Sequence, residues 1–165
     1  MQAGGPHGIA NAGYRAIESL RLEKAYRAWG ADIGPDHSPL VAGLGWALKL
    51  GKDIPFLGRE AIEAQHAKPL PRLLAGFLVD GRDVVLLGRE TIYRNGKRAG
   101  WLTSAGWGYT VGKNIGLGYV RNSKQGVDAD YVLSGQYEVE VATERVPAHV
   151  FLKPPYDPEM RRVKA

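Results

Sequence analysis

The sequence predicts an α+β protein in which a partly helical first part is followed by a small antiparallel β-barrel. Three observations lead to this fold class. Apolar residues follow a helical spacing in residues 11–28, a polar segment with two prolines occupies residues 65–72, and short apolar or alternating runs separated by glycines fill the rest of the chain. Repeated short strands with glycine turns are typical of a closed or nearly closed barrel.

The first part of the chain contains two predicted helices. The longer one covers residues 11–28, with Asn11 as a suitable N-cap. It is expected to end near Gly30, because glycine readily takes the left-handed conformation that closes a helix. Two prolines exclude a continuous helix over residues 32–39, and a short second helix is expected over residues 56–64.

A linker divides the chain into two predicted domains. Residues 65–72 combine two prolines with polar side chains, so we expect one domain at 1–68 and another at 69–165. In the second domain, Asn95-Gly96 is the strongest hairpin signal, because a type I′ turn needs positive φ at both central positions. The predicted strands are residues 73–79, 84–87, 91–94, 99–104, 115–121, 131–133, 137–142 and 146–151.

The composition is that of an ordinary globular protein. The chain has 165 residues, 44% of them hydrophobic and 24% charged, which argues against disorder and against a collagen-like fibre. It has no cysteine, so disulfides, thiolate metal sites and a cysteine nucleophile are excluded. The 22 glycines are an excess over the usual share of about 7% and predict many turns and close backbone contacts.

Charge and hydropathy narrow the classes of partner. The net charge of +5 is mild and spread along the chain. This favours an anionic ligand over nucleic acid, which usually requires a clustered basic face. No apolar run approaches the roughly 20 residues that cross a bilayer, and the N-terminus has no secretory pattern. We therefore expect a cytoplasmic protein that binds neither membrane nor nucleic acid.

Glu23 is the most informative residue of the first part. It follows Leu20 by three positions and Ala16 by seven, so the helical spacing places it on the same face as these apolar side chains. A buried carboxylate must be paired or hydrogen-bonded. Two interpretations remain open: an ion pair with Arg27 one turn later, or contact with a ligand.

Other catalytic motifs are absent or incomplete. Residues 106–114 resemble a phosphate-binding loop, but the glycine spacing is too short and Asn114 replaces the required hydroxyl. Trp107 and Tyr109 in this stretch either pack on the first part or stack on a planar ligand. No Gly-x-Gly-x-x-Gly motif predicts an FAD or NAD site, and the four separated histidines predict no metal site.

Several ordered segments resemble the glycine cleavage T-protein family of folate-dependent aminomethyltransferases. The first segments are residues 12–24, with the Leu-Arg-Leu-Glu motif that ends at Glu23, and residues 29–33 and 38–45. The similarity continues in residues 56–60, 100–106 and 115–120. The sequence of residues 13–24 is most similar to the folate-binding C-terminal part of dimethylglycine and sarcosine dehydrogenases.

The resemblance implies one-carbon transfer to tetrahydrofolate. Members of this family hold tetrahydrofolate so that its N5 attacks an aminomethyl or iminium carbon, which gives 5,10-methylenetetrahydrofolate. The family's motif implies that Glu23 contacts the pterin, whose adjacent N–H donors suit a carboxylate. It also implies that Lys52, near the position of a folate-binding basic residue, helps to bind the folate, and that Tyr14 flanks the pterin.

The resemblance covers only the C-terminal part of the family's pattern. Family members carry most of the folate domain, including an essential aspartate, before the Leu-Arg-Leu-Glu helix. Asp32, Asp36 and Asp53 do not match that motif, so no catalytic acid or base is assigned. We therefore expect the remnant of a folate-binding domain plus a barrel, catalytically incomplete without an upstream folate or flavin domain or a separate subunit. The rival hypothesis is a non-catalytic assembly module that contributes its barrel to a partner chain.

Overall fold

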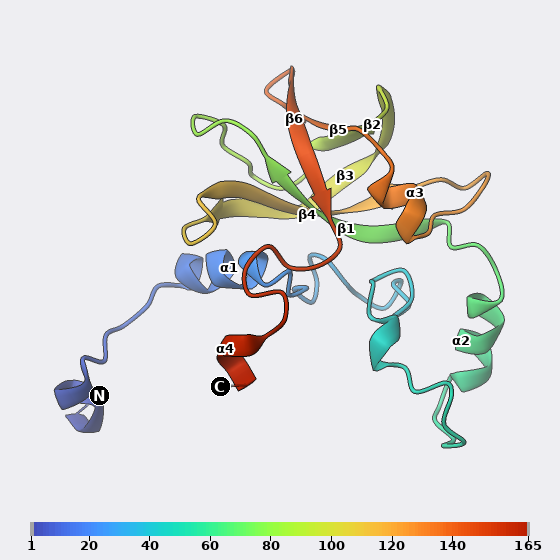
Figure 1. Ribbon diagram of the computed structural model, residues 1–165, viewed down its shortest axis with the longest axis horizontal. Coiled ribbons are helices and arrows are strands. Elements are labelled where there is room, and N and C mark those ends of the chain that lie inside the picture. Colours follow the sequence, from blue (N-terminus) through green and yellow to red (C-terminus); the bar gives the residue numbers. More distant parts are fainter. Residues whose placement is uncertain (1, 165) are drawn as a thin grey trace.

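The computed structural model describes residues 2–164 and has short helices around one β-barrel (Figure 1). The helices are η1 (Gln2–His7), α1 (Tyr14–Glu23), η2 (Gly45–Ala47), α2 (Arg59–His66), α3 (Ala129–Leu133) and α4 (Arg161–Lys164). The strands are β1 (Arg72–Val79), β2 (Thr91–Arg94), β3 (Lys97–Gly108), β4 (Lys113–Arg121), β5 (Tyr137–Val141) and β6 (Glu144–Phe151).

The six strands form a closed antiparallel barrel, which confirms the predicted fold class. Their order around the barrel is β1-β4-β3-β2-β5-β6, and β1 closes it by pairing with both β4 and β6. The interior is filled by alternate side chains of the strands, among them Phe77, Ile92, Leu102 and Val139, all fully buried. The predicted hairpin turn joins β2 to β3, with φ of +51° at Asn95 and +74° at Gly96.

The helix α1 is shorter than the sequence predicts. Asn11 does not cap it; the helix begins after Gly13, which has an extended backbone and provides no side-chain cap. It ends at Glu23 because Ala25 takes the left-handed conformation, with φ of +52°, and Tyr26 N donates to the carbonyl oxygen of Arg21. A left-handed alanine is uncommon, which is why the sequence points to Gly30 instead.

Two of the predicted strands are wrong. Residues 131–133 belong to the helix α3, because Asp128 caps it by accepting a hydrogen bond from Tyr131 N at 2.7 Å. Residues 84–87 lie in the β1–β2 connection and form no strand. At the N-terminus, Gln2–His7 form a short 3₁₀ helix, η1. Apolar content alone does not distinguish residues 84–87 and 131–133 from strands.

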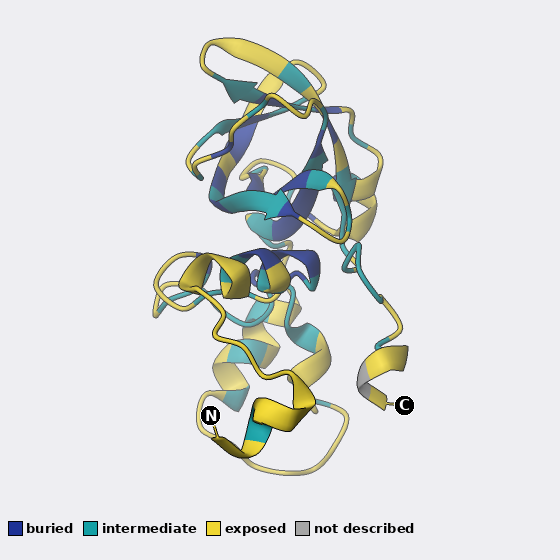
Figure 2. Cartoon of the chain, turned by 90° about the vertical axis from the view of Figure 1, so that its left-hand side faces the viewer, coloured by how far each residue is buried: buried dark blue, intermediate teal, exposed yellow. Residues whose placement is uncertain are grey.

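The helix α1 lies against the outer face of the barrel, over β3 and β4 (Figures 1 and 2). Its buried side chains are Ser19, Leu22 and Glu23, and Leu22 packs against Ile115 and Leu117 of β4. The predicted apolar face is not the buried one: Leu20 is 60% exposed. None of the helices in the described range is long and apolar enough to cross a membrane.

Candidate functional site

The Glu23 carboxylate is buried between α1 and the tip of the β3–β4 hairpin. Its side chain is only 1% exposed, and Oε1 accepts hydrogen bonds from Thr110 N at 2.6 Å and from Val111 N at 3.0 Å. Arg27 instead donates to backbone carbonyls, including that of Ala42 at 3.0 Å. The Glu23–Arg27 ion pair, one of the two open interpretations, is therefore not formed in the structure.

The two oxygens of this carboxylate differ in their partners. Both hydrogen bonds from the hairpin reach Oε1, and none from residues 2–164 reaches Oε2. Gly108 leaves the space for the side chain, because a Cβ there would stand 3.1 Å from the Glu23 Cγ and Oε1. A carboxylate fixed through one oxygen can accept a ligand N–H with the other.

A polar network next to Glu23 fixes the position of α1. Asp32 is fully buried and accepts hydrogen bonds from Arg21 Nη1 at 3.0 Å, from Ala28 N at 2.9 Å and from the Thr103 hydroxyl. Arg21 also donates to Ser104 Oγ at 2.9 Å. Sequence reasoning missed this network, although its Arg21, Thr103 and Ser104 all lie inside the segments that carry the family resemblance.

Tyr14 and Lys52, the other two predicted site residues, lie away from the buried carboxylate. Tyr14 begins α1 and is 76% exposed; it lines a cavity of about 650 Å³ together with Trp107 and Tyr109. Lys52 is exposed in the loop between η2 and α2. No hydrogen bond among the described residues joins either side chain to Glu23, and the roles of Tyr14 and Lys52 stay predictions.

The two aromatic residues of the hairpin segment have different surroundings. Trp107 is half-buried, and its carbonyl oxygen accepts a hydrogen bond from Ser19 Oγ at 2.7 Å, so this part of β3 packs on the first part of the chain. Tyr109, at the tip, is 81% exposed. Packing thus describes Trp107, whereas the Tyr109 ring remains available to a planar ligand.

A second cavity lies on the other side of the end of α1. It has a volume of about 500 Å³ and is lined by Lys24, Trp46 and residues of the C-terminal segment. That segment is tied to α1: Tyr156 N donates to the Glu23 carbonyl oxygen at 3.1 Å, and Lys24 Nζ donates to the Asp157 carbonyl oxygen at 2.8 Å. Across the described residues no cluster of side chains has the composition of a metal site.

Comparison with known proteins identifies the family. The model of the glycine cleavage T-protein C-terminal barrel domain matches residues 72–157, and that of the GCVT N-terminal domain matches residues 1–52. The chain belongs to the glycine cleavage T-protein family. Its segment 72–157 contains all six barrel strands, so the family resemblance inferred from the sequence motifs is confirmed.

Similar proteins include dehydrogenases and aminomethyltransferases, all with chains longer than this one. The chain is 48% identical over 165 residues to mouse sarcosine dehydrogenase and 38% identical over 154 residues to human dimethylglycine dehydrogenase; it spans 18% and 17% of their lengths. It is 35% identical to the aminomethyltransferase of Desulfitobacterium hafniense, covering 82% of this chain and 37% of that protein. The crystal structure of aminomethyltransferase T from Bartonella henselae superposes with a TM-score of 0.74 at 29% identity, covering 92% of this chain and 41% of that one.

Proposed function

We propose that the chain is the C-terminal segment of a tetrahydrofolate-dependent aminomethyltransferase-type protein. The supporting observation is Glu23, a buried carboxylate at the family's folate-contacting motif, with its Oε2 without a hydrogen bond from the described residues. The neighbouring pterin N–H donors are the chemical complement of such an oxygen. The reaction class is one-carbon transfer that yields 5,10-methylenetetrahydrofolate, of the glycine cleavage or of the dimethylglycine and sarcosine demethylation type.

In this proposal the residues of the chain bind and orient the folate. Tetrahydrofolate itself supplies the N5 nucleophile. Glu23 fixes the pterin, Tyr14 at the start of α1 flanks the ring system, and Lys52 attracts the folate carboxylates as a point charge. Asp32 and Arg21 act by holding α1 on the barrel, which fixes the direction of the Glu23 side chain. Positioning of this kind is a large part of catalysis when a bound nucleophile must meet an electrophilic carbon.

Isothermal titration calorimetry with a reduced folate measures the Kd that tests the role of Glu23. Glu23→Gln keeps an oxygen that can accept from the hairpin N–H groups but removes the charge offered to the pterin. We expect Kd to rise at least about tenfold, because a hydrogen bond to a charged group contributes roughly 1.5–3 kcal/mol.

The matched control is Glu60→Gln, an exposed carboxylate in the first turn of α2. It changes the net charge equally and is expected to leave Kd within about twofold of the wild type. Absence of folate binding by the wild-type chain, or the same Kd for the wild type and Glu23→Gln, would contradict the pterin role.

A non-catalytic assembly module is the second candidate function. Large apolar side chains of the first part are exposed, including Ile17 at 57%, Trp46 at 76% and Leu57 at 104%, and exposed apolar surface often marks an interface. One relative, 39% identical over 164 residues, is the mitochondrial pyruvate dehydrogenase phosphatase regulatory subunit of mouse. Size-exclusion light scattering distinguishes the two: stable self-association without folate affinity favours assembly, and folate binding by a monomer favours transfer.

A division into a T-protein-like folate-domain segment at 1–68 and a barrel domain with its tail at 69–165 fits the two family models. Folate is the proposed partner, together with an upstream folate or flavin region or subunit; neither an FAD site nor a metal site is assigned to this chain. Several relatives are named as mitochondrial, and for this chain a cytoplasmic location stays a proposal.

A further inference from the structure

A strongly basic groove lies at the end of the barrel opposite to Glu23. β1 begins and β4 ends there, with Arg72 facing Arg121 in the register, whereas the hairpin tip that holds Glu23 joins the other ends of β3 and β4. The groove has a volume of about 860 Å³. In Figure 1 this end of the barrel, with α3, lies on the right, and the hairpin tip lies on the left above α1. We call it the barrel-end groove.

The barrel-end groove concentrates positive charge that the chain does not neutralise. Five cationic side chains line it: Arg72, Lys97, Arg98, Arg121 and Lys124. Between residues 2 and 164 no Asp or Glu contributes to the lining, and none of the five takes part in an ion pair. Burial and the nearby charge of Arg72 both lower the pKa of Arg121, so like charges interact there. A bound anion would remove this repulsion.

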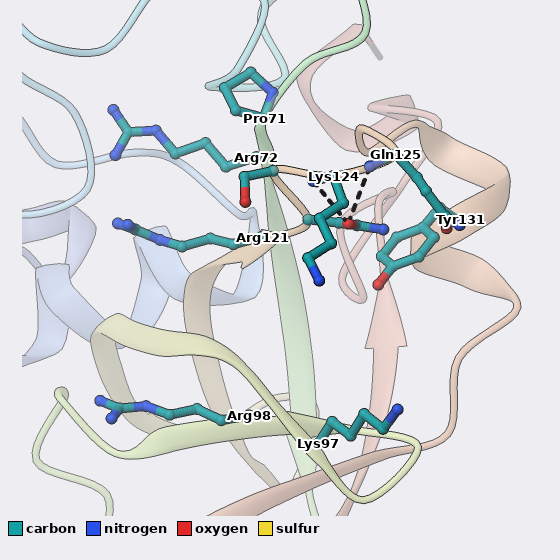
Figure 3. A pocket seen from close by; sticks show the side chains of 10 residues that line it. Pro71, Arg72, Lys97, Arg98, Arg121, Lys124, Gln125 and Tyr131 are labelled. Carbon is teal, nitrogen blue, oxygen red and sulfur yellow. Dashed lines mark hydrogen bonds between the residues drawn. The ribbon is translucent and has the colours of Figure 1, made fainter.

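Two of the guanidinium groups are held in place by aromatic rings. Arg121 lies over the Trp101 ring at 4.0 Å from its centroid, and Arg72 lies over the Tyr119 ring at 5.1 Å. Figure 3 shows the side chains of Arg72, Arg121 and Arg98 extending in the same direction. Arg72 Nη2 also donates to the Asp36 carbonyl oxygen at 3.0 Å, whereas no described residue accepts a hydrogen bond from the Arg121 guanidinium. Stacking therefore leaves the planar edge of Arg121 available for two parallel hydrogen bonds to a phosphate or carboxylate, and the ordered side chain loses less entropy on binding.

The segment after β4 is also ordered. Asn122 Oδ1 accepts hydrogen bonds from Lys124 N and Gln125 N, each at 3.3 Å, and Gly126 N donates to the Asn122 carbonyl oxygen at 2.9 Å (Figure 3). Lys124 belongs to this turn and lines the groove. Its backbone is therefore held in place by hydrogen bonds.

A smaller cavity extends the barrel-end groove along the β2–β3 turn. It has a volume of about 370 Å³, shares Lys97, Arg98 and Arg121 with the groove and adds Arg94. Arg94 is fixed over the Tyr131 ring at 3.8 Å and donates to the Tyr131 carbonyl oxygen. The cations thus continue from one cavity to the next, which suits an elongated ligand better than a single small ion.

We propose that the barrel-end groove binds a linear multivalent anion whose charged groups reach from the arginines Arg72 and Arg121 to the lysines Lys97 and Lys124, which extend from the other side of the groove (Figure 3). Phosphate and carboxylate groups share the chemistry that guanidinium and ammonium donors recognise, so the ligand is an oligophosphate or an oligocarboxylate. The site is separate from Glu23 and does not depend on folate binding.

Isothermal titration with two probes tests the proposal, inorganic tripolyphosphate in one arm and an oligoglutamate peptide in the other. At roughly 20 mM salt, where surface charges are weakly screened, we expect binding of at least one probe. The probe that binds identifies phosphate or carboxylate as the charged group. Binding of both probes means that the groove recognises the spacing of the negative charges and not the kind of group. The groove variant Lys97→Gln, Arg98→Gln, Lys124→Gln changes only exposed side chains. We expect it to raise Kd about tenfold or more, because three phosphate or carboxylate contacts are lost.

A control variant with the same net charge separates a site from general attraction. Lys49→Gln, Lys68→Gln, Lys164→Gln removes three exposed cations outside the groove and is expected to change Kd by less than about twofold. Equal weakening by both triple variants would show attraction to net charge and would overturn the proposal. Failure of both probes to bind the wild-type chain would overturn it as well.

Discussion

At the scale of single residues, two buried tyrosines give the fold a sensitivity to alkaline pH. Burial raises the pKa of Tyr119 and of Tyr137 to about 12 from 10.0. The unfolded chain therefore loses these protons first, so the stabilisation is complete below about pH 10 and is lost as the pH rises towards 12. Each tyrosine is expected to account for a loss on the order of 2 kcal/mol over this window.

Denaturant unfolding between pH 9 and 12 measures this loss. Because lysines titrate in the same range, the informative quantity is the difference between the wild type and Tyr119→Phe or Tyr137→Phe, whose stability should fall less steeply with pH. Tyr109→Phe controls for removal of an exposed phenol, since Tyr109 is 81% exposed. Parallel pH profiles for the wild type and both buried variants would contradict the prediction.

At the scale of elements, the glycines of the barrel allow strands to approach each other closely. A Cβ on Gly100 of β3 would stand 1.9 Å from the Tyr119 carbonyl oxygen of β4, a backbone atom that cannot move without breaking the strand pairing. We expect Gly100→Ala to destabilise the chain by about 3 kcal/mol or more, as overpacking does. The lowering of the urea midpoint measures this effect. Gly51→Ala, where the new methyl group meets nothing within 4 Å, should leave the midpoint nearly unchanged.

The same elements show how far the sequence predicts the structure. Strand alternation and the Asn95-Gly96 turn are local signals, so β2 was predicted with its observed bounds, residues 91–94. The end of α1 depends on a left-handed alanine, Ala25, and the helix α3 depends on a single capping residue. These features are settled by packing and capping rather than by hydropathy, and the sequence predicted them incorrectly.

The candidate site also has one part that the sequence indicates, Glu23, and another part that it does not, the partners of Glu23. The sequence singles out Glu23 as a carboxylate among apolar side chains, and Glu23 is buried, but with Ser19 and Leu22 rather than with the exposed Leu20 of the predicted face. Its partners, the backbone N–H groups of Thr110 and Val111, are 87 and 88 residues away in the sequence. Backbone donors have no residue signature, and neither does the barrel-end groove, whose cations come from β1, β3, β4 and the turn after β4 and meet only when the barrel closes.

At the scale of the whole molecule, the first part of the chain depends on the barrel for its stability. The main core cluster consists of residues from 73 onwards, whereas the buried residues of the first part share their clusters with barrel residues, as Leu22 does with Ile115 and Val41 does with Leu74. Polar contacts add to this connection: Tyr119 Oη donates to the Asp32 carbonyl oxygen at 2.9 Å. The first part therefore needs the barrel for its stability, whereas the barrel has a core of its own.

This asymmetry predicts different effects of two core substitutions on amide hydrogen exchange. Asp32→Asn places an amide group opposite Arg21 and should weaken the attachment of α1 by about 3 kcal/mol, since it disrupts a buried charge pair. Exchange should then accelerate in α1 and leave the barrel core unchanged. Val139→Ala, inside the barrel, should accelerate exchange throughout the chain, because the first part has no core of its own. Equal acceleration in both parts by Asp32→Asn would contradict the prediction by showing that the barrel also depends on the first part. Protection of α1 in Val139→Ala while the barrel opens would contradict it by showing that the first part folds independently.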